Sequence, residues 1–460
     1  MKRIGMQASK GLELTGMGGL VLVGSLLKRF TSFQNDFNRQ FTKGPGGIPF
    51  GDVLIPGLAM LCTGKSDFEA VSHLRHSTWA RALQGGLIAS PETLRENLDL
   101  LGDSAFPASR EIIETAILNL MRNTRMLPSA MWTGHVALDI DTSPQDNSKT
   151  VKEGIGRTYK GCDGYCPILA YTGQEGFLIG AEFRTGTPHS QKNVPAFIAK
   201  QLQRLRSLGV DHVLVRLDSG FDATETMLSI DDENADFIIS VNPRSEDGQI
   251  WIDQAKALPA SAWIRIKDVR NLRIAYLERE ETRLDKEGRK IKVRRIVRVK
   301  KRLVVEVPEK NAHAPILHRW VALEVGSSWS TKLELPAPEI ARLYEDHGTS
   351  EPFHSELKGE LDLERLPSGK FNTNALVFQL GCLAYNLLRV LALKGKAVFR
   401  YRHPNKRKRL KTVIQELILL PARFLGGSNQ IRLDLGKSHP GRDAILALHR
   451  ELVTSLPKIA

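Results

Sequence analysis

The chain has 460 residues, of which 42% are hydrophobic and 25% are charged. This is the composition of a globular protein with a large buried core, and it excludes a collagen-like, coiled-coil or wholly disordered chain. Lys and Arg together number 65 against 51 for Asp and Glu, which gives a net charge of +14. A chain this basic indicates a polyanionic partner, usually nucleic acid, although net charge can also serve solubility alone.

Cysteine usage and the apolar runs indicate an intracellular protein. Four cysteines are too few for a disulfide framework in so long a chain, and Cys162 and Cys166 have no second pair at zinc-site spacing. The apolar run 18–27 is too short to cross a bilayer, and no small-residue cleavage site follows it. The run 376–393 contains Gln, Asn and Arg and is typical of a buried core helix. We therefore expect a cytoplasmic protein without a membrane contact.

Residues 1–130 are predicted to form a helical domain. The segment 90–102 begins with a Ser cap and a Pro and ends in Gly, and 111–121 is amphipathic. Segments 53–62 and 68–76 carry apolar residues at helical spacing. Small helical domains often bind DNA, but they are also common as scaffolds without a binding function. The sequence leaves both interpretations open.

Strands dominate the segment 131–242. Apolar segments of strand length lie at 135–142, 165–173, 177–184, 212–221 and 237–242, with an amphipathic helix at 194–209. Three consecutive strands fit a meander, and the later alternation of strands with helices fits parallel crossover connections. The pattern predicts a mixed sheet flanked by helices.

The segment 243–335 is predicted to be a β-rich insertion. Within it, 291–310 alternates apolar and basic residues with the period of a strand, and 318–330 is also strand-like. Helical patterns return in the segment 336–398, at 338–346, 351–366 and 374–394. The last segment, 399–460, is expected to be a basic helical region with a cationic cluster at 400–411.

A few acids stand out by their position. Asp139 and Asp141 lie at i and i+2 of one predicted strand and so point to the same face of the sheet. Asp218 ends a second apolar strand, and Glu351 begins a helix far downstream. Carboxylates grouped beside an apolar sheet need neutralisation, which Mg²⁺ provides, and a pair of such ions suits phosphodiester chemistry.

Each of these acids also has an ordinary structural interpretation. An Asp at a strand end, such as Asp218 before Ser219 and Gly220, often serves as a turn or cap residue. Glu351 fits the first turn of a helix, where the macrodipole favours an acid. The residues alone therefore leave the metal site as one alternative.

Four segments occur in an order that matches a known family. They are LDIDTSP at 138–144, GRTYKGCDGYCPILAYTG at 156–173, LVRLDSGFDATE at 214–225 and YEDHGTSEPFHSELK at 344–358. In the last segment, Tyr344, Glu351 and Lys358 stand at the spacing of a Tyr-x2-Arg-x3-Glu-x6-Lys signature. On these segments the chain resembles the DDE transposases of bacterial insertion sequences, in particular the insertion sequence 1380 group.

The resemblance implies an α/β fold with an RNase H-like catalytic core. Residues 131–242 would form its first part, the β-rich insertion 243–335 would interrupt it, and residues 336–398, with the Glu351 helix, would complete it. It implies that two Mg²⁺ ions, which Mn²⁺ can replace, are held by Asp141, Asp218 and Glu351. Water would free a 3′-hydroxyl at the transposon end, and this hydroxyl would then attack target DNA.

The resemblance also implies how DNA is held. The expected DNA contacts are Tyr344, His347 and Lys358. The partners would be the terminal inverted repeats, bound through the helical N-terminal domain, and the target DNA. Synapsis of two ends implies a homodimer on DNA.

The sequence departs from the signature at two positions. His347 replaces the signature Arg, and an imidazole binds phosphate as a cation only when it is protonated. Pro352 directly follows Glu351 and disfavours the α region for it, which places Glu351 at a helix start. Glu356 is therefore kept as a fallback metal ligand, and Asp139 is kept as a fallback for Asp141.

Two further features have open interpretations. The basic strand 291–302 and the tail 406–411 could follow phosphates or simply be solvated. Trp320 and Trp329 could hold a flipped base, as in some relatives of this family, although core packing is the simpler interpretation.

The sequence thus predicts a cut-and-paste DNA transposase. Another RNase H-like nuclease or recombinase would share the acids but would not join transposon ends to a target. A transposase-derived DNA-binding protein would have lost cleavage altogether. Inverted repeats with short direct duplications around the coding region would favour the first prediction.

Overall fold

The computed structural model describes residues 11, 13–75, 77–83, 88–187, 191–242, 247–266, 269, 271–306, 317–330, 333–398, 407–425, 431–437, 439 and 441–454. The chain divides into two compact units. Unit 1 comprises residues 1–129, 142–188 and 351–460, and unit 2 comprises residues 130–141 and 189–350. The N-terminal helices and the helices after residue 351, which we expected as separate segments, therefore share one unit.

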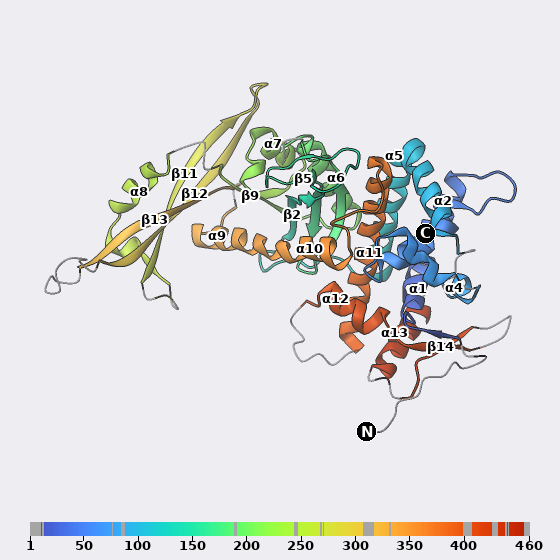
Figure 1. Cartoon of the computed structure of the whole chain (residues 1–460). Coiled ribbons are helices and arrows are strands. Elements are labelled where there is room, and N and C mark those ends of the chain that lie inside the picture. The colour runs from blue at the N-terminus through green and yellow to red at the C-terminus, as the bar shows by residue number, and fades with distance from the viewer. Residues whose placement is uncertain are drawn as a thin grey trace. The chain divides into compact units, whose positions relative to one another are not determined.

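Two long helices, α5 and α11, pack side by side in unit 1 (Figure 1). The helices of this unit are α1 (Leu20–Phe30), α2 (Phe33–Gln40), α3 (Phe50–Leu61), α4 (Ser77–Ala82), α5 (Pro91–Thr124), α10 (Glu351–Ser355), α11 (Phe371–Val398), α12 (Leu410–Val413) and α13 (Arg442–Thr454). A 3-10 helix, η1 (Phe68–Leu74), also contacts α5 and α3. The expected helical character of the N-terminal part is confirmed.

Helix α5 joins two segments that the sequence predicts as separate helices. Its start is the expected one, because the Ser90 side-chain oxygen accepts a hydrogen bond from the Thr93 backbone N–H at 3.1 Å. The backbone leaves helical geometry at Ala105, whose φ is −137°. Pro107 follows within the same turn and lacks a backbone donor, which accounts for the kink.

Helix α11 is apolar and long enough to cross a membrane by length and composition, but 94% of its most apolar window is buried inside the structure. Its polar residues bond to strand β7 (Phe177–Glu182). The Asn386 side chain accepts from the Leu178 N–H at 3.1 Å and donates to the Leu178 carbonyl at 2.8 Å. The Gln379 amide donates to the Ala181 carbonyl at 3.0 Å. These bonds satisfy backbone groups of β7, and the expected core helix is confirmed.

The strands of unit 1 form three small groups. Strand β6 (Ile168–Thr172) pairs antiparallel with β7. A three-stranded sheet has the order β3 (Gln145–Asp146), β5 (Asp163–Tyr165), β4 (Gly156–Arg157). A second has the order β1 (Leu14–Thr15), β14 (Ala422–Leu425), β15 (Arg432–Asp434). The first of these small sheets directly follows the strand that carries Asp141 along the chain.

Unit 2 is built on one mixed sheet. Its strands run in the order β10 (Ile264–Arg265), β11 (Leu272–Leu284), β12 (Lys290–Glu306), β13 (Leu317–Ser330), β9 (Asp236–Ser240), β8 (Val213–Leu217), β2 (Val136–Thr142). Strands β2, β8 and β9 are parallel neighbours, and β13 pairs antiparallel with β9. The helices are α6 (Val194–Ser207), α7 (Thr224–Asp232), α8 (Gln249–Lys256) and α9 (Ala337–Glu345). The predicted parallel crossovers are confirmed, and the β-rich insertion extends the same sheet.

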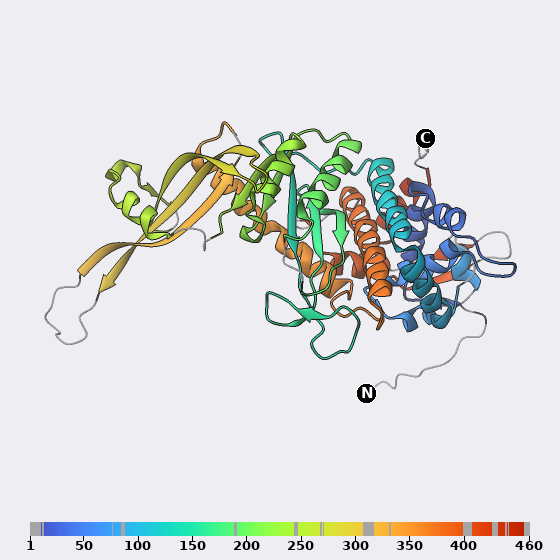
Figure 2. The same cartoon turned by 90° about the horizontal axis from the view of Figure 1, so that it is seen from above.

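The insertion has a small core between α8 and its three long strands (Figure 2). Trp251 of α8 packs with Val297 and Val299 of β12. The Arg295 guanidinium lies 4.8 Å from the ring centre of Trp251 and 4.9 Å from that of Trp329. Trp329 is only 3% exposed, so core packing is the interpretation that its surroundings favour. The side chain of Trp320 lies outside the described residues.

Several cations of the basic strand have partners within unit 2. Arg294 pairs with Glu278 at 2.5 Å and donates to the Leu333 carbonyl at 3.0 Å. Arg298 pairs with Glu345 of α9. The strand therefore uses these guanidinium groups to attach its neighbours.

Candidate active site

The strand that carries the first acids is held by a buried ion pair. Asp139 is 3% exposed, and the parallel register places it opposite Arg216 of β8. The guanidinium donates to both carboxylate oxygens of Asp139 at 2.7 Å and to the Leu343 carbonyl at 2.8 Å. Both oxygens of Asp139 are thus occupied by the chain itself, so the fallback role of Asp139 as a metal ligand does not fit its surroundings.

His347 also bonds to Asp139. Its Nδ1 lies 2.9 Å from a carboxylate oxygen of Asp139, and its ring stacks on Tyr344 with ring centres 5.9 Å apart. Burial alone would raise the pKa of Asp139, but the hydrogen bonds and charges of His347 and Arg216 outweigh it and lower the pKa. Asp139 is therefore an ionised anchor for the segment that carries Tyr344 and His347.

Asp218 stands in a different environment. One of its oxygens accepts a hydrogen bond from the Gly220 N–H at 2.9 Å, so the predicted role of Asp218 as a turn or cap residue is confirmed. Burial raises the pKa of this carboxyl, and the Gly220 bond and the charge of His347 offset only part of that effect. A half-buried carboxylate that the chain neutralises incompletely is a suitable ligand for an added cation.

Asp141, Asp218 and Tyr344 gather within unit 2. Burial raises the pKa of the Tyr344 hydroxyl, a hydrogen bond with Ser240 lowers it, and the negative charges of Asp218 and Asp141 raise it further. Strands β2 and β8 are parallel, so the residues at their carboxyl ends meet at one edge of the sheet. Two of the three predicted catalytic acids are therefore brought together, with Tyr344 and His347 beside them.

The donor set of unit 2 fits part of a divalent-cation site. Carboxylate oxygens are the ligands that Mg²⁺ prefers, and Asp141 and Asp218 supply them on half-buried side chains. Among the described residues, no group of three or more His, Cys, Asp or Glu side chains is arranged as a metal site. A cation at these two acids would therefore need a further ligand, which Glu351 is predicted to supply.

Glu351 is the first residue of α10 in unit 1, and its side chain is exposed. The effect expected from Pro352 is thus confirmed, because the helix starts at the residue before the proline. The predicted helix over 351–366 is shorter than expected. It passes into a π-helical turn at Glu356–Glu360 and then ends, and Asp362 follows with a left-handed φ of 58°.

Glu356 is the buried anchor of this π-helical turn. It is fully buried, and its Oε2 accepts from Arg389 of α11 at 2.7 Å, from Arg407 at 2.8 Å and from the Tyr385 hydroxyl at 3.3 Å. Its Oε1 accepts from the Leu410 N–H at 3.3 Å. A carboxylate paired with two guanidinium groups does not fit the fallback role of a metal ligand, since a bound cation would have to displace them.

The described part of the basic tail folds onto this same turn. Arg409 pairs with Glu360 at 2.6 Å, and the Lys411 N–H donates to Glu360 at 2.6 Å. Lys408 pairs with Glu416 at 2.8 Å. Arg409 and the Lys411 backbone thus fasten the turn that follows α10, whereas Lys408 pairs within the tail. Lys406 lies outside the described residues.

Lys358 also makes contacts within unit 1. Its ammonium group donates to the Pro144 carbonyl and lies 3.7 Å from Glu364. Close by in the chain, the Gln145 amide donates to the Leu363 carbonyl at 2.9 Å. The segment after the first-acid strand is thus bonded to the segment after the π-helical turn.

Sequence reasoning did not find the acids with which two buried arginines pair. Arg216 stands inside the apolar strand LVRLD, and Arg389 stands inside the apolar helix α11. A guanidinium at such a place must find an acid when it is buried, because an unpaired buried charge is very costly. This signal predicts a partner for each, but it does not say that the partners are Asp139 and Glu356.

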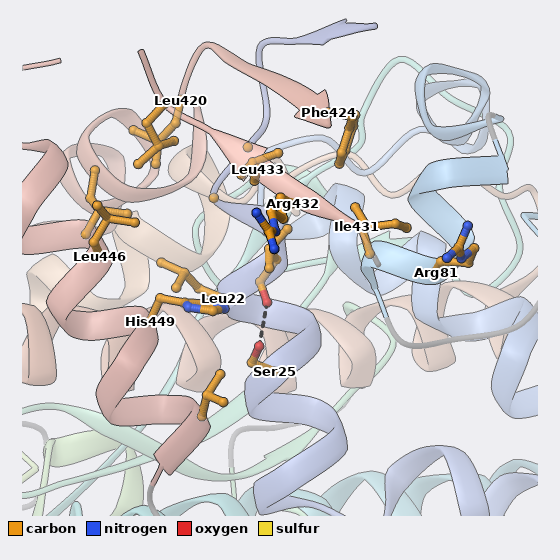
Figure 3. Close-up of a pocket in the computed structure, with 17 residues that line it drawn as sticks. Leu22, Ser25, Arg81, Leu420, Phe424, Ile431, Arg432, Leu433, Leu446 and His449 are labelled. Carbon is orange, nitrogen blue, oxygen red and sulfur yellow. Dashed lines mark hydrogen bonds between the residues drawn. The ribbon is translucent and has the colours of Figure 1, made fainter. Parts of the chain in front are cut away.

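A cavity of about 620 Å³ in unit 1 lies among α1, α13, β14 and β15 (Figure 3). Its lining is mainly apolar, with Leu22, Leu433 and Leu446 around it, and includes His449, whose pKa is lowered by burial. The residues that line it include none of the predicted metal ligands or DNA contacts. We therefore do not assign the active site to this cavity.

Comparisons with known proteins give one family. The family model described as transposase DDE domain group 1 matches residues 6–456 of the chain. No curated protein matches. Among solved structures, the chain is similar to the cryo-EM structure of a piggyBac transposase synaptic complex with hairpin DNA, with 10% sequence identity and a TM-score of 0.42 over 98% of this chain and 89% of that chain.

Proposed function

The chain belongs to the transposase DDE domain group 1 family and is a DNA transposase, and on this premise we propose that Asp141, Asp218 and Glu351 are its catalytic carboxylates. The observation that carries the proposal is the pair of half-buried acids, Asp141 and Asp218, at the ends of two parallel strands. Asp139 and Glu356 are set aside because arginines already occupy their carboxylates.

The chemistry that we propose is metal-dependent cleavage at the transposon ends, followed by transfer of the freed 3′-hydroxyl into target DNA. Asp141 and Asp218 would hold divalent cations, Mg²⁺ or Mn²⁺, together with Glu351. When bound, such ions neutralise phosphate oxygens and favour deprotonation of the attacking oxygen. The raised pKa of Asp218 supports this assignment, because a neighbouring cation would remove the penalty of ionising a partly buried carboxyl.

The residues around the acids would position them and bind DNA. Arg216 and Asp139 fix the strand that carries Asp141, and the His347 bond to Asp139 holds the segment that carries Tyr344. We propose that Tyr344 and His347 contact phosphates near the cleaved strand. Lys358 is the third proposed contact, since an ammonium group has three donors and can bind more than the Pro144 carbonyl.

We further propose an RNase H-like topology for the catalytic core and an origin in a bacterial insertion sequence of the 1380 group. The partners would be the terminal inverted repeats and target DNA, with a homodimer in the synaptic complex and a location at the nucleoid. The net charge of +14 supports a DNA partner.

The test is cleavage of a duplex that carries the terminal repeat found beside the coding region. In Asp218→Asn, we expect cleavage with Mg²⁺ to fall at least about 1,000-fold, since metal-ion catalysis contributes several kcal/mol, while DNA affinity is retained. Asp232→Asn is the matched control, because Asp232 is an exposed acid of α7. Unchanged cleavage in Asp218→Asn would refute the proposal.

The same assay separates the rivals. If the wild-type protein cleaves the ends but never joins them to target DNA, it is an RNase H-like nuclease. If it binds the ends and does not nick them with Mg²⁺ or Mn²⁺, it is a DNA-binding protein derived from a transposase.

A further inference from the structure

Residues 145–165 of unit 1, here called the flap, form the small sheet β3-β5-β4 and its two connecting loops (Figure 2). We propose that the flap is a DNA-binding element that places Lys149, Arg157 and Lys160 on phosphates and Tyr159 against an unpaired base. This inference rests on the proposed transposase function and adds a contact surface outside the acid cluster and the signature residues.

The base of the flap is fixed to the rest of unit 1. Gln145 and Asn147 are each 1% exposed, and the Asn147 amide donates to the Glu364 carbonyl at 3.1 Å. The Tyr165 ring is fully buried with its centre 4.6 Å from that of Phe183. Because the base is already ordered, the flap would lose little further conformational freedom on binding a ligand.

A tight turn displays the aromatic side chain. The Thr158 N–H donates to the Cys162 carbonyl at 2.9 Å, and the Gly161 N–H donates to the Thr158 carbonyl at 3.0 Å. Gly161 has a φ of 79°, which a residue with a side chain rarely adopts. The turn leaves Tyr159 65% exposed and Lys160 exposed beside it.

The flap exposes charges of both signs, but its two exposed acids are engaged by backbone hydrogen bonds. The Asp146 carboxylate accepts from the Ser148 N–H at 3.0 Å, and the Glu153 carboxylate accepts from the Phe371 N–H at 3.0 Å.

The cations of the flap differ in exposure. The Lys152 ammonium is half-buried and donates to Asn147 at 3.2 Å. Lys149 and Lys160 are exposed.

Arg157 is the third outward cation of the flap. Its side chain is 67% exposed, and its ion pair with Asp163 is 3.4 Å long. Exposed ion pairs of this kind are weak, so a phosphate can replace Asp163 as the partner of the guanidinium.

This combination fits DNA better than a protein surface. Outward cations bind phosphates irrespective of sequence, and an exposed aromatic ring offers a stacking surface to any base that has left its pair. The exposed apolar side chains, Val151 and Tyr159, stand on separate loops and are accompanied by cations, whereas an interface between protein copies is depleted of charge at its centre.

The test measures the affinity of the full-length protein for the terminal-repeat duplex, with and without an unpaired end, over a series of salt concentrations. We expect the double variant Arg157→Ala/Lys160→Ala to bind about tenfold more weakly and to lower the salt slope by about 2, at about 0.9 per lost phosphate contact. The control is Lys437→Ala/Arg442→Ala, which removes the same charge from unit 1 outside the flap and should change neither quantity.

Tyr159→Leu tests the stacking contact. It should leave the salt slope unchanged, weaken binding of the unpaired end about tenfold and abolish photo-crosslinking to 5-iodouracil placed there. Wild-type affinity and slope in the double variant would overturn the proposal. So would a change of oligomeric state in Tyr159→Leu with DNA affinity retained, which would make the flap a protein interface. Both results are independent of whether Asp218→Asn loses cleavage.

Discussion

Two clusters of acids in this molecule differ in what neutralises them. Glu356 in unit 1 is fully buried and paired with Arg389 and Arg407, whereas Asp218 in unit 2 is half-buried with a single backbone hydrogen bond from Gly220 described for its carboxylate. The two arginines neutralise the charge of Glu356, whereas the pKa of Asp218 is raised. Burial and position alone also describe structural anchors, so an acid that suits a cation is distinguished from them by its incomplete neutralisation.

Asp139 and Asp141 repeat this contrast within one strand. Asp139 is 3% exposed and paired with Arg216 on both oxygens, and Asp141, two residues on, is half-buried and close enough to Tyr344 to raise its pKa. Asp139 therefore anchors the strand, and Asp141 is the acid of this strand that we propose as a metal ligand.

The largest expected effect on stability comes from breaking the structural anchor. Glu356→Gln should lower the free energy of unfolding by about 3 kcal/mol, because it leaves the buried guanidinium of Arg389 and the partly buried one of Arg407 without their counter-charge. Urea unfolding of the full chain measures this effect. Glu360→Gln is the matched control in the same turn, where Arg409 is half exposed and the loss should be smaller. Equal losses in both variants would contradict the assignment of Glu356 as the anchor.

Asp139→Asn should cost about 2 kcal/mol at pH 7, since it weakens charge-assisted hydrogen bonds to Arg216 and His347. The folded-state pKa of Asp139 is lowered, so its contribution is present above the unfolded pKa, about 3.9, and is lost as the pH falls through the folded value. The difference between wild type and variant should therefore shrink in acid. Urea unfolding at several pH values measures it, and a difference that grows in acid would contradict the ion pair.

The smallest effect on the free energy of unfolding is expected for Asp218→Asn, and it should be a gain in stability where the two preceding variants lose stability. Its folded-state pKa is raised, so ionisation costs stability as the pH rises from the unfolded pKa through the folded one, and Asp218→Asn should be slightly more stable at pH 7 without metal. Mg²⁺ at tenfold its dissociation constant should stabilise the wild type by about 1.4 kcal/mol and the variant by much less. Thermal unfolding with Mg²⁺ and with EDTA measures both. Equal stabilisation of the two proteins would remove Asp218 from the cation site.

Local patterns predicted many of the elements well. The Ser90 cap, the strand at Val136–Thr142 and the helix at Val194–Ser207 follow from capping, apolar runs and helical spacing. Strand β11 was missed, because most of Glu278–Leu284 is exposed and carries little apolar alternation. It is a strand because each of its residues pairs with β12.

The predicted roles of the site residues depended on distant partners. The basic tail was interpreted as a solvated face or a phosphate track, and its described part instead holds the π-helical turn through Glu356 and Glu360. Lys358 was expected on DNA, and it also bonds to the Pro144 carbonyl. No local pattern reports such contacts, since the partners are far apart in the chain.

By itself, the sequence determined the alternation of strands and helices and the order of the acid-bearing segments, because hydrophobic periodicity and capping act over a few residues. Which acids serve as anchors depends on the fold, which pairs Asp139 and Glu356 with arginines. That choice depends on whether a guanidinium from another strand or helix reaches the carboxylate, and the energy of a buried charge is set by all of its neighbours in space.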